Sequence, residues 1–333
     1  FRSRMKNLLL TFAVFLVSLN LYSSDLLQPV DTKNTFLFYI SHLFMPQFSS
    51  ESFYSKRMFS VSASESNTIF DPVYFKNNDK NAVIDVETSC MSLFYSEKTL
   101  YDIELSVSVS FIRHWSGFLD GPIENFHSLP VFGSGLPNGG REHVPRDEMN
   151  IYCESGGKKF SLSKSFYGIS DPSIFIKKSF VSDQLSFYFS AAVKPSIGNK
   201  DFINSKTVDF GLSAGLDFRK ERMYLFGSAA LVKYFGNGSF ADELDQNKKY
   251  MSSACIGGGY SISENTAVVA QFYIHSSIYD TGVKRLDLPT VCNTYAFRWR
   301  YCNSSVLQFD ITEDPFTYAT ADICLNIKNE TRF

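Results

Sequence analysis

Two stretches of the chain alternate apolar residues with small or polar residues. From Ile103 to Phe111 the odd positions are apolar, whereas the even positions from Asp102 to Ser110 are acidic residues or serine. The pattern returns from Val208 to Phe218, where Asp209 to Asp217 supply aspartate, glycine and serine on the other face. Successive side chains of a β-strand point to opposite faces, so a period of two predicts strands with one apolar and one polar face.

Less regular forms of the same pattern continue along the chain after residue 56. Together they predict strands over residues 57–68, 82–94, 101–111, 148–154, 158–166, 173–181, 184–194, 208–218, 222–234, 249–260, 266–277, 291–301, 305–312 and 317–327. The connections alternate in length, being short at 96–98, 182–183 and 219–221 and long at 116–147, 195–205, 235–248 and 278–289. Bacterial outer-membrane barrels have an even number of strands, short periplasmic turns and long outer loops.

Alternation alone does not separate a soluble barrel from a membrane barrel. The less apolar face is mainly Ser, Gly and Ala, whereas a solvated face usually carries many Lys and Glu. The ten steps from Tyr101 to Phe111, at about 3.3 Å each and tilted by about 40°, project to roughly 25 Å, the height of the apolar band of a membrane barrel. No segment has the roughly 18 uninterrupted apolar residues that a membrane helix needs, so any span is made of strands.

We therefore predict an all-β fold, a single antiparallel transmembrane β-barrel of about 12–14 strands. The barrel covers residues 57–333, and its long loop 116–147 contains a short helix. Before it, Arg2, Arg4 and Lys6 precede an apolar run over residues 8–17 and then small residues, which is the order of a signal peptide. We predict a signal peptide over residues 1–24, a periplasmic or lumen segment over 25–56, and a location in the outer membrane of a diderm bacterium.

Charge and cysteine content exclude some functions. The 32 Lys and Arg balance 34 Asp and Glu, so no basic excess indicates nucleic-acid binding. The six cysteines lack the spacing of zinc or redox sites. Cys292 and Cys302 lie too far apart along one predicted strand to form a disulfide, while a bridge between Cys302 and Cys324 stays open. We expect no cofactor; the expected partners are outer-membrane lipid and small solutes, and the oligomeric state is left open.

The long loop carries a candidate polar cluster. Pro122 suits the first turn of a helix, on which Asp120, Glu124 and His127 would share one face at i, i+4 and i+7. These side chains could bind a divalent cation. We favour a structural network in which they cap the helix, pair with Arg113 or Arg141, and fix the loop over the barrel mouth, so no metal site is predicted.

Other polar residues are predicted to point into the lumen. Asp102, Glu104 and His114 occupy the inward face of one predicted strand, where they would line a polar path or a water-filled interior. The sequence has no HExxH helix, P-loop or dinucleotide fingerprint. We therefore do not predict an enzyme, and a membrane-embedded hydrolase is the remote alternative.

Several short motifs carry a family resemblance. They are Ser66-Asn67-Thr68-Ile69-Phe70, Arg113-His114 followed by Gly117-Phe118-Leu119-Asp120-Gly121, Ile123-Glu124-Asn125-Phe126-His127, and Leu136-Pro137-Asn138-Gly139-Gly140-Arg141-Glu142. These motifs resemble the outer-membrane family called domain of unknown function 3187. Where that family tends to have Gly-Leu-Gly-Asp, this chain has Gly168-Ile169-Ser170-Asp171, which makes Asp171 a weaker site candidate. The resemblance implies an outer-membrane barrel and no particular activity.

The leading functional hypothesis is a passive pore or channel for small solutes, with loop 116–147 as its constriction. The alternative is an occluded barrel with a structural or surface ligand-binding role and no transport. A carrier of apolar compounds would require an apolar lumen, and the Ser- and Gly-rich inner faces argue against it.

Overall fold

The computed structural model describes residues 26–49, 57–70, 82–99, 101–127, 145–155, 158–182, 184–236, 248–280, 284–315 and 319–333, and the predicted signal peptide lies outside these ranges. In chain order the elements are β1 (Arg57–Phe70), β2 (Ala82–Lys98), β3 (Ile103–Trp115), α2 (Asp120–His127), β4 (Asn150–Ser155), β5 (Lys158–Leu162), β6 (Phe166–Ile169), β7 (Ser173–Phe180), β8 (Leu185–Lys194), β9 (Val208–Lys220), β10 (Met223–Phe235), β11 (Tyr250–Ser261), β12 (Thr266–His275), α3 (Lys284–Asp287), β13 (Thr290–Cys302), β14 (Ser305–Glu313) and β15 (Ile323–Arg332).

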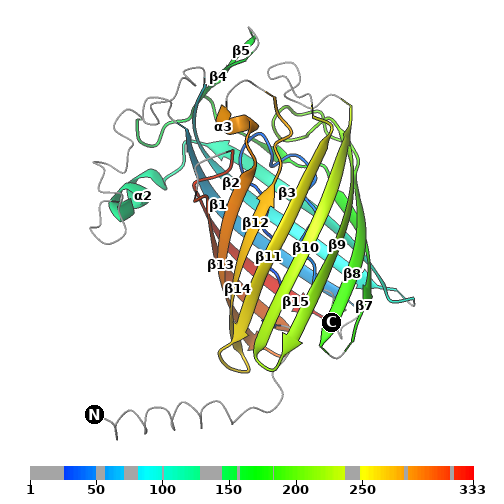
Figure 1. Cartoon of the computed structure of the whole chain (residues 1–333). Coiled ribbons are helices and arrows are strands. Elements are labelled where there is room, and N and C mark those ends of the chain that lie inside the picture. Colours follow the sequence, from blue (N-terminus) through cyan, green and yellow to red (C-terminus); the bar gives the residue numbers. More distant parts are fainter. Residues whose placement is uncertain are drawn as a thin grey trace, which may run out of the picture.

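Twelve strands form a closed antiparallel wall (Figure 1). The wall runs through β1, β2 and β3, continues from β7 to β15, and closes where β15 pairs with β1 from Met58↔Arg332 to Asn67↔Ile323. The predicted all-β barrel is confirmed. Two predicted strands are not wall strands, because β4 and β5 form a hairpin that extends β2 beyond the wall, with Ala82 opposite Cys153.

The two ends of the barrel differ. Neighbouring strands are joined by short turns at 99–102, 181–184, 221–222, 262–265 and 303–304, and these turns share one end. The barrel also begins and finishes there, since Arg57 N donates to Phe333 O at 3.2 Å. We call this the periplasmic end and the end with the long loops the extracellular end, as in other membrane barrels.

The wall has an apolar outer face. Exposed side chains on it include Leu93, Leu105, Phe189, Leu212, Ile256, Phe309 and Leu325. Such an apolar belt faces lipid in membrane barrels. A barrel wall can lie in lipid because its main-chain hydrogen-bonding groups are paired within the sheet. Within the described part of the chain, neither helix is long and apolar enough to cross a bilayer.

Residues 26–49 lie inside the barrel, and we call this segment the plug. It begins near the periplasmic end, rises along β11, β12 and β13, and turns at the extracellular end, where Phe36 O accepts hydrogen bonds from Tyr39 N and Ile40 N, both at 2.9 Å. It then descends along β9, β8 and β7. Of the two locations predicted for the N-terminal segment, the structure places these residues in the lumen.

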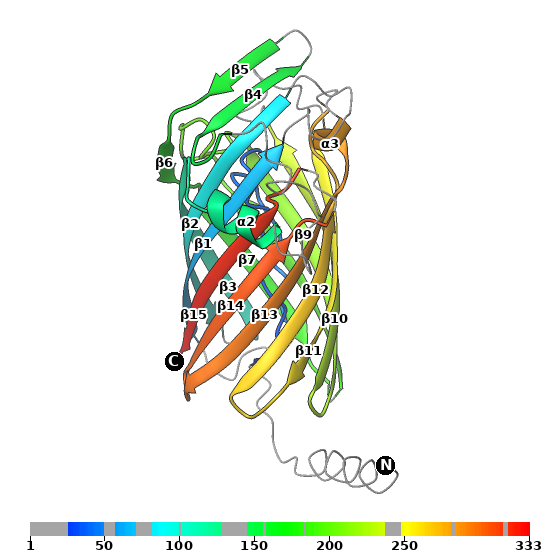
Figure 2. The ribbon, with the colours of Figure 1, turned by 90° about the vertical axis from the view of Figure 1, so that its left-hand side faces the viewer.

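Helix α2 lies outside the barrel (Figure 2). Leu119 N donates to Glu87 Oε1 at 2.6 Å, and Asn67 Nδ2 donates to Asp120 Oδ1 at 2.8 Å. Glu87 and Asn67 share the parity of the outward-facing residues of β2 and β1. The described residues 116–127 therefore cover the outer wall and not the mouth, contrary to the predicted placement of the helix; residues 128–144 of the loop lie outside the described ranges.

Candidate functional site

The ascending limb of the plug is held to the wall by polar side chains. Val30 N donates to Gln271 Oε1 at 2.8 Å, and Gln271 Nε2 donates to Val30 O and to Thr32 Oγ1, both at 2.7 Å. The Thr32 hydroxyl also lies 2.8 Å from that of Thr294. Thr32 N donates to Gln47 Oε1 on the descending limb at 2.8 Å. Wall side chains thus replace the strand partners that this extended segment lacks.

The turn of the plug fills the extracellular end of the lumen with aromatic rings. Phe36, Phe38 and Tyr39 are fully buried and pack edge-on against one another or against Tyr279. Tyr39 OH donates to Ser277 at 3.0 Å, and Tyr279 OH donates to Phe38 O. The plug therefore fills this end of the lumen with apolar side chains.

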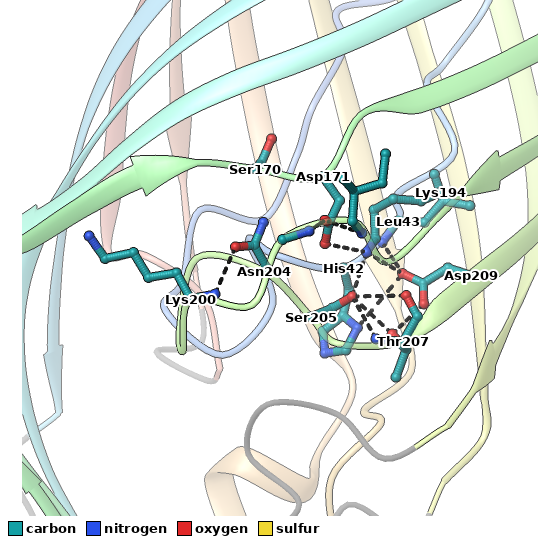
Figure 3. A network of polar contacts seen from close by, with 12 residues as sticks. His42, Leu43, Ser170, Asp171, Lys194, Lys200, Asn204, Ser205, Thr207 and Asp209 are labelled. Atoms are coloured by element: carbon teal, nitrogen blue, oxygen red, sulfur yellow. Dashed lines mark hydrogen bonds and ion pairs between the residues drawn. The ribbon is translucent and has the colours of Figure 1, made fainter.

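The descending limb meets a buried charge network (Figure 3). Lys194 Nζ lies 3.3 Å from Asp209 and 3.5 Å from Asp171, and Asp209 accepts a hydrogen bond from Leu43 N at 2.9 Å. The His42 ring lies against Tyr234, 3.9 Å from the Asp209 carboxylate. Burial, together with the nearby charges of Lys194 and Lys33, lowers the pKa of His42 to about 3, so the His42 ring is neutral.

A polar cavity of about 170 Å³ lies beside the plug, on the side of the lumen formed by β14, β15, β1, β2 and β3. Its walls are rich in hydroxyl groups, contributed by Ser60, Ser62, Ser64, Ser92, Ser108 and Ser110. The plug contributes Asp31 and Lys33 to the same cavity. A cavity lined in this way is suited to water and hydrogen-bonding solutes.

Ion pairs line the periplasmic part of this cavity. Glu104 on β3 lies 2.8 Å from Nζ of Lys177, its cross-strand neighbour on β7, and both side chains are buried. Glu330 pairs with Lys328 at 3.1 Å, with Arg298 at 3.1 Å and with Arg332 at 3.0 Å. Acidic and basic groups are therefore arranged in contact, and each neutralises the other in the lumen.

Three of the predicted site residues lie within the barrel. Glu104 points into the lumen, and His114 is fully buried there, with Nδ1 at 2.9 Å from the Thr88 hydroxyl. Asp171 belongs to the Lys194 network. Asp102 was wrongly placed in the lumen: it lies in the periplasmic turn, where its exposed carboxylate pairs with Lys98 at 2.8 Å.

Those of the other predicted residues that the structure describes lie on the outer wall. The Arg113 guanidinium lies 4.1 Å from the centre of the Trp115 ring and has no ion pair with Asp120 or Glu124 among the described residues, so of the two predicted partners Arg113 is not the one observed. Asp120 accepts hydrogen bonds from Asn67 and from Asp147 N, and Glu124 pairs with Arg146. Arg141 and the His127 side chain lie outside the described residues. Among the described residues no cluster suited to a metal ion is present, and all six cysteines are free.

The sequence allowed a lumen location for residues 25–56 as one of two alternatives, but it did not reveal the wall residues that hold the plug. Lys194 and Asp209 both fall on the face of their predicted strands that carries mainly small residues. A charged side chain on that face indicates a buried partner inside the barrel, and this signal was available in the sequence. The plug has no such signal, because its aromatic residues follow neither a period of two nor one of 3.6.

Comparisons with known proteins identify a family and a fold. The sequence model of one family, described as protein of unknown function (DUF3187), matches residues 49–333. No curated protein matches the chain. Among solved structures, the COG4313 outer membrane channel from Pseudomonas putida F1 is 11% identical, with a TM-score of 0.54 over 85% of this chain and 97% of that one. This likeness shows a shared barrel fold.

Two further solved structures are similar at lower scores. The NanC porin is 6% identical and has a TM-score of 0.48 over 83% of this chain and all of that one. The P. putida toluene transporter TodX is 9% identical, with a TM-score of 0.43 over 85% of this chain and 91% of that one.

Proposed function

The chain belongs to the DUF3187 family of proteins of unknown function, and we propose that it is an outer-membrane channel for small polar solutes whose lumen is restricted by the plug. The observation that carries this proposal is the serine-lined cavity beside the plug. Six of its serines come from inward-facing positions of three adjacent strands, β1, β2 and β3. Hydroxyl groups can replace part of the hydration shell of a polar solute without selecting a particular charge.

The charges around the cavity favour uncharged or zwitterionic solutes. The lining includes the acids Asp31, Glu104, Asp310 and Glu330 and the bases Lys33, Lys177 and Lys328. Because the two signs are nearly balanced and several of these groups are paired, the lumen attracts neither anions nor cations strongly.

The plug is the better candidate for the constriction than loop 116–147. It fills the side of the lumen facing β7 to β13 and seals the extracellular end with Phe36, Phe38 and Tyr39. The described part of the loop lies on the outer wall. We therefore propose residues 26–49 as the constriction, in place of loop 116–147.

Liposome swelling tests both the substrate class and the constriction. Proteoliposomes holding the intact chain or a chain lacking residues 26–49 are placed in solutions of arabinose, glycine or sodium gluconate. We expect faster swelling after the deletion, with arabinose and glycine preferred to gluconate. Faster swelling in gluconate than in arabinose would contradict the proposed substrate class. Heat-dependent gel mobility confirms that both proteins are folded.

The extent of the plug's contacts favours a second candidate, an occluded barrel that does not transport. The plug is hydrogen-bonded to the wall on both limbs, from Val30 to Ser49. If the folded barrel is impermeable both with and without the plug, the channel is excluded and this second function remains.

A further inference from the structure

The barrel wall is interrupted at its extracellular end. The ladder between β7 and β8 stops at Ile174↔Val193. Beyond that point β6 follows β3, from Phe111↔Ile169 to His114↔Phe166, while β8 extends only one residue further along β9, to Lys194↔Asp209. Among the described residues no strand pairs with the second edge of β6. The main-chain hydrogen bonds that seal a membrane barrel are therefore missing between β6 and β8.

The loop over residues 195–207 covers this interruption through side chains. Asn204 Nδ2 donates to Ile169 O at 3.1 Å, and Lys200 Nζ donates to Tyr167 O. A Cβ at Gly168 would lie 3.1 Å from Ile203 Cγ2, so glycine permits the loop to pack closely on β6. These contacts can separate without disturbing any strand ladder.

Apolar side chains lie on both sides of the loop. Towards the lumen, Ile203 is buried in a cluster with Ile40 of the plug and Ile112 of β3. Towards the bilayer, Tyr167, Ile169 and Ile197 are 60%, 66% and 71% exposed. An apolar molecule would therefore meet apolar surface outside the wall and again behind the loop.

The loop and the plug share the buried charge network (Figure 3). Asp171, directly after β6, accepts hydrogen bonds from Ile197 N at 2.9 Å and Gly198 N at 2.8 Å. Lys194 links Asp171 to Asp209, which binds Leu43 N of the plug. Near the other end of the loop, the Ser205 hydroxyl accepts a hydrogen bond from Lys194. Movement of the loop and movement of the plug are thus coupled through the same three charged residues.

We propose that loop 195–207 is a lid over an opening in the side of the barrel, through which amphipathic molecules pass between the outer leaflet and the apolar end of the lumen. The apolar part of such a molecule contacts the isoleucine cluster behind the lid. Its polar group binds the hydroxyl and amide groups of the lid, on Asn204, Ser205 and Thr207. The inference goes beyond the polar channel and does not depend on it, because the two routes reach different parts of the lumen.

A reversible lock on the lid tests this proposal. The substitutions G168C and I203C place two thiols across the contact between β6 and the lid, and C90S removes the native thiol of the same cluster. The full chain is reconstituted in phosphatidylcholine vesicles with a diazirine-bearing dodecanoic acid as the probe. After illumination, labelled peptides are mapped by mass spectrometry.

The expected result is that oxidation of the two thiols lowers labelling of plug residues 36–43 several-fold and that reductant restores it. Labelling of the lipid-facing side of β12 is the internal control and stays constant. A matched pair, A230C with S253C, joins β10 to β11 away from the lid and leaves plug labelling unchanged. Equal plug labelling in locked and unlocked protein, or none in either, would overturn the proposal.

A second variant tests the lid from the opposite direction. D171N removes the charge that holds Lys194 and weakens two hydrogen bonds to the lid, so plug labelling rises. D201N is the control, because Asp201 lies on the same loop and its ion pair with Lys206 is exposed to solvent, away from the buried network. A folded D171N protein with the labelling of the unsubstituted chain would contradict the role of this network in holding the lid.

Discussion

The two sides of the lumen share one strand pattern and differ in what they hold. On the side formed by β7 to β13, which we call the plugged side, inward-facing tyrosines such as Tyr188, Tyr224 and Tyr273 pack around the plug. Gly211 leaves room there for the side chain of Met45. On the side formed by β14, β15, β1, β2 and β3, which we call the open side, the inward-facing positions are mostly serine and line the cavity. Large rings next to glycine create shaped contacts for an inserted segment, whereas a row of serines binds water equally well everywhere. The side chains of the inner face therefore decide which side is filled.

The largest effect is expected at the charge network that joins the plug to the plugged side. Asp209→Asn leaves Lys194 with Asp171 as its remaining acidic partner and weakens the bond from Leu43 N. Loss of one member of a buried ion pair costs about 3 kcal/mol. Urea unfolding in detergent should show this loss, together with higher conductance. An unchanged unfolding midpoint would mean that the plug is not anchored there.

A smaller effect is expected from crowding the plugged side. Gly211→Val introduces a Cβ whose position lies only 2.3 Å from the Met45 sulfur, so the descending limb must shift. Overpacking of this kind costs roughly 1–3 kcal/mol. Gly227→Val is the matched control, since the nearest atom to a Cβ there is 3.7 Å away. Equal unfolding midpoints for the two variants would contradict the close contact between plug and wall.

Substitutions on the open side should affect permeation more than stability. Ser62→Leu together with Ser108→Leu narrows the cavity without touching the plug anchors. We expect slower arabinose swelling in the chain lacking residues 26–49, with an unfolding free energy that changes by no more than about 1 kcal/mol. Undiminished swelling would show that solutes do not pass through this cavity.

The smallest effect is expected at Glu104, and Asp102, two residues away in the sequence, serves as its control. Glu104→Gln removes the negative charge that pairs with Lys177 in the lumen, so the reversal potential in a salt gradient should shift towards anion selectivity. Asp102→Asn, in the periplasmic turn, should leave selectivity unchanged. Equal shifts for both variants would contradict the placement of Glu104 alone in the conducting space.

The wall strands could be predicted because the alternation of apolar and polar residues is visible within each strand, without knowledge of its neighbours. Strands predicted at 82–94 and 305–312 are observed as Ala82–Lys98 and Ser305–Glu313. The last strand was predicted at 317–327 and is observed as Ile323–Arg332, because the outward-facing Asn329 and Thr331 end the apolar stripe before the strand ends. Polar residues near the membrane edge hide the end of a strand from a pattern based on hydrophobicity.

The plug was not predictable in the same way. Its hydrogen-bond partners lie far along the chain, as with Val30 and Gln271, which are 241 residues apart. The same segment without those partners would be compatible with the periplasm. The position of α2 has a signal in the sequence, because Glu87 falls on the outward face of its predicted strand. A carboxylate on that face needs a hydrogen-bond donor that shields it from lipid, and Leu119 N beside α2 is that donor.

The proposal that the plug, and not loop 116–147, restricts the lumen can be tested directly. Single-channel conductance in planar bilayers tests it for the intact chain, a chain lacking residues 26–49 and a chain lacking residues 118–143, with heat-dependent gel mobility confirming that each is folded. We expect a large rise in conductance when residues 26–49 are removed and little change when residues 118–143 are removed. A rise only after loss of residues 118–143 would contradict it.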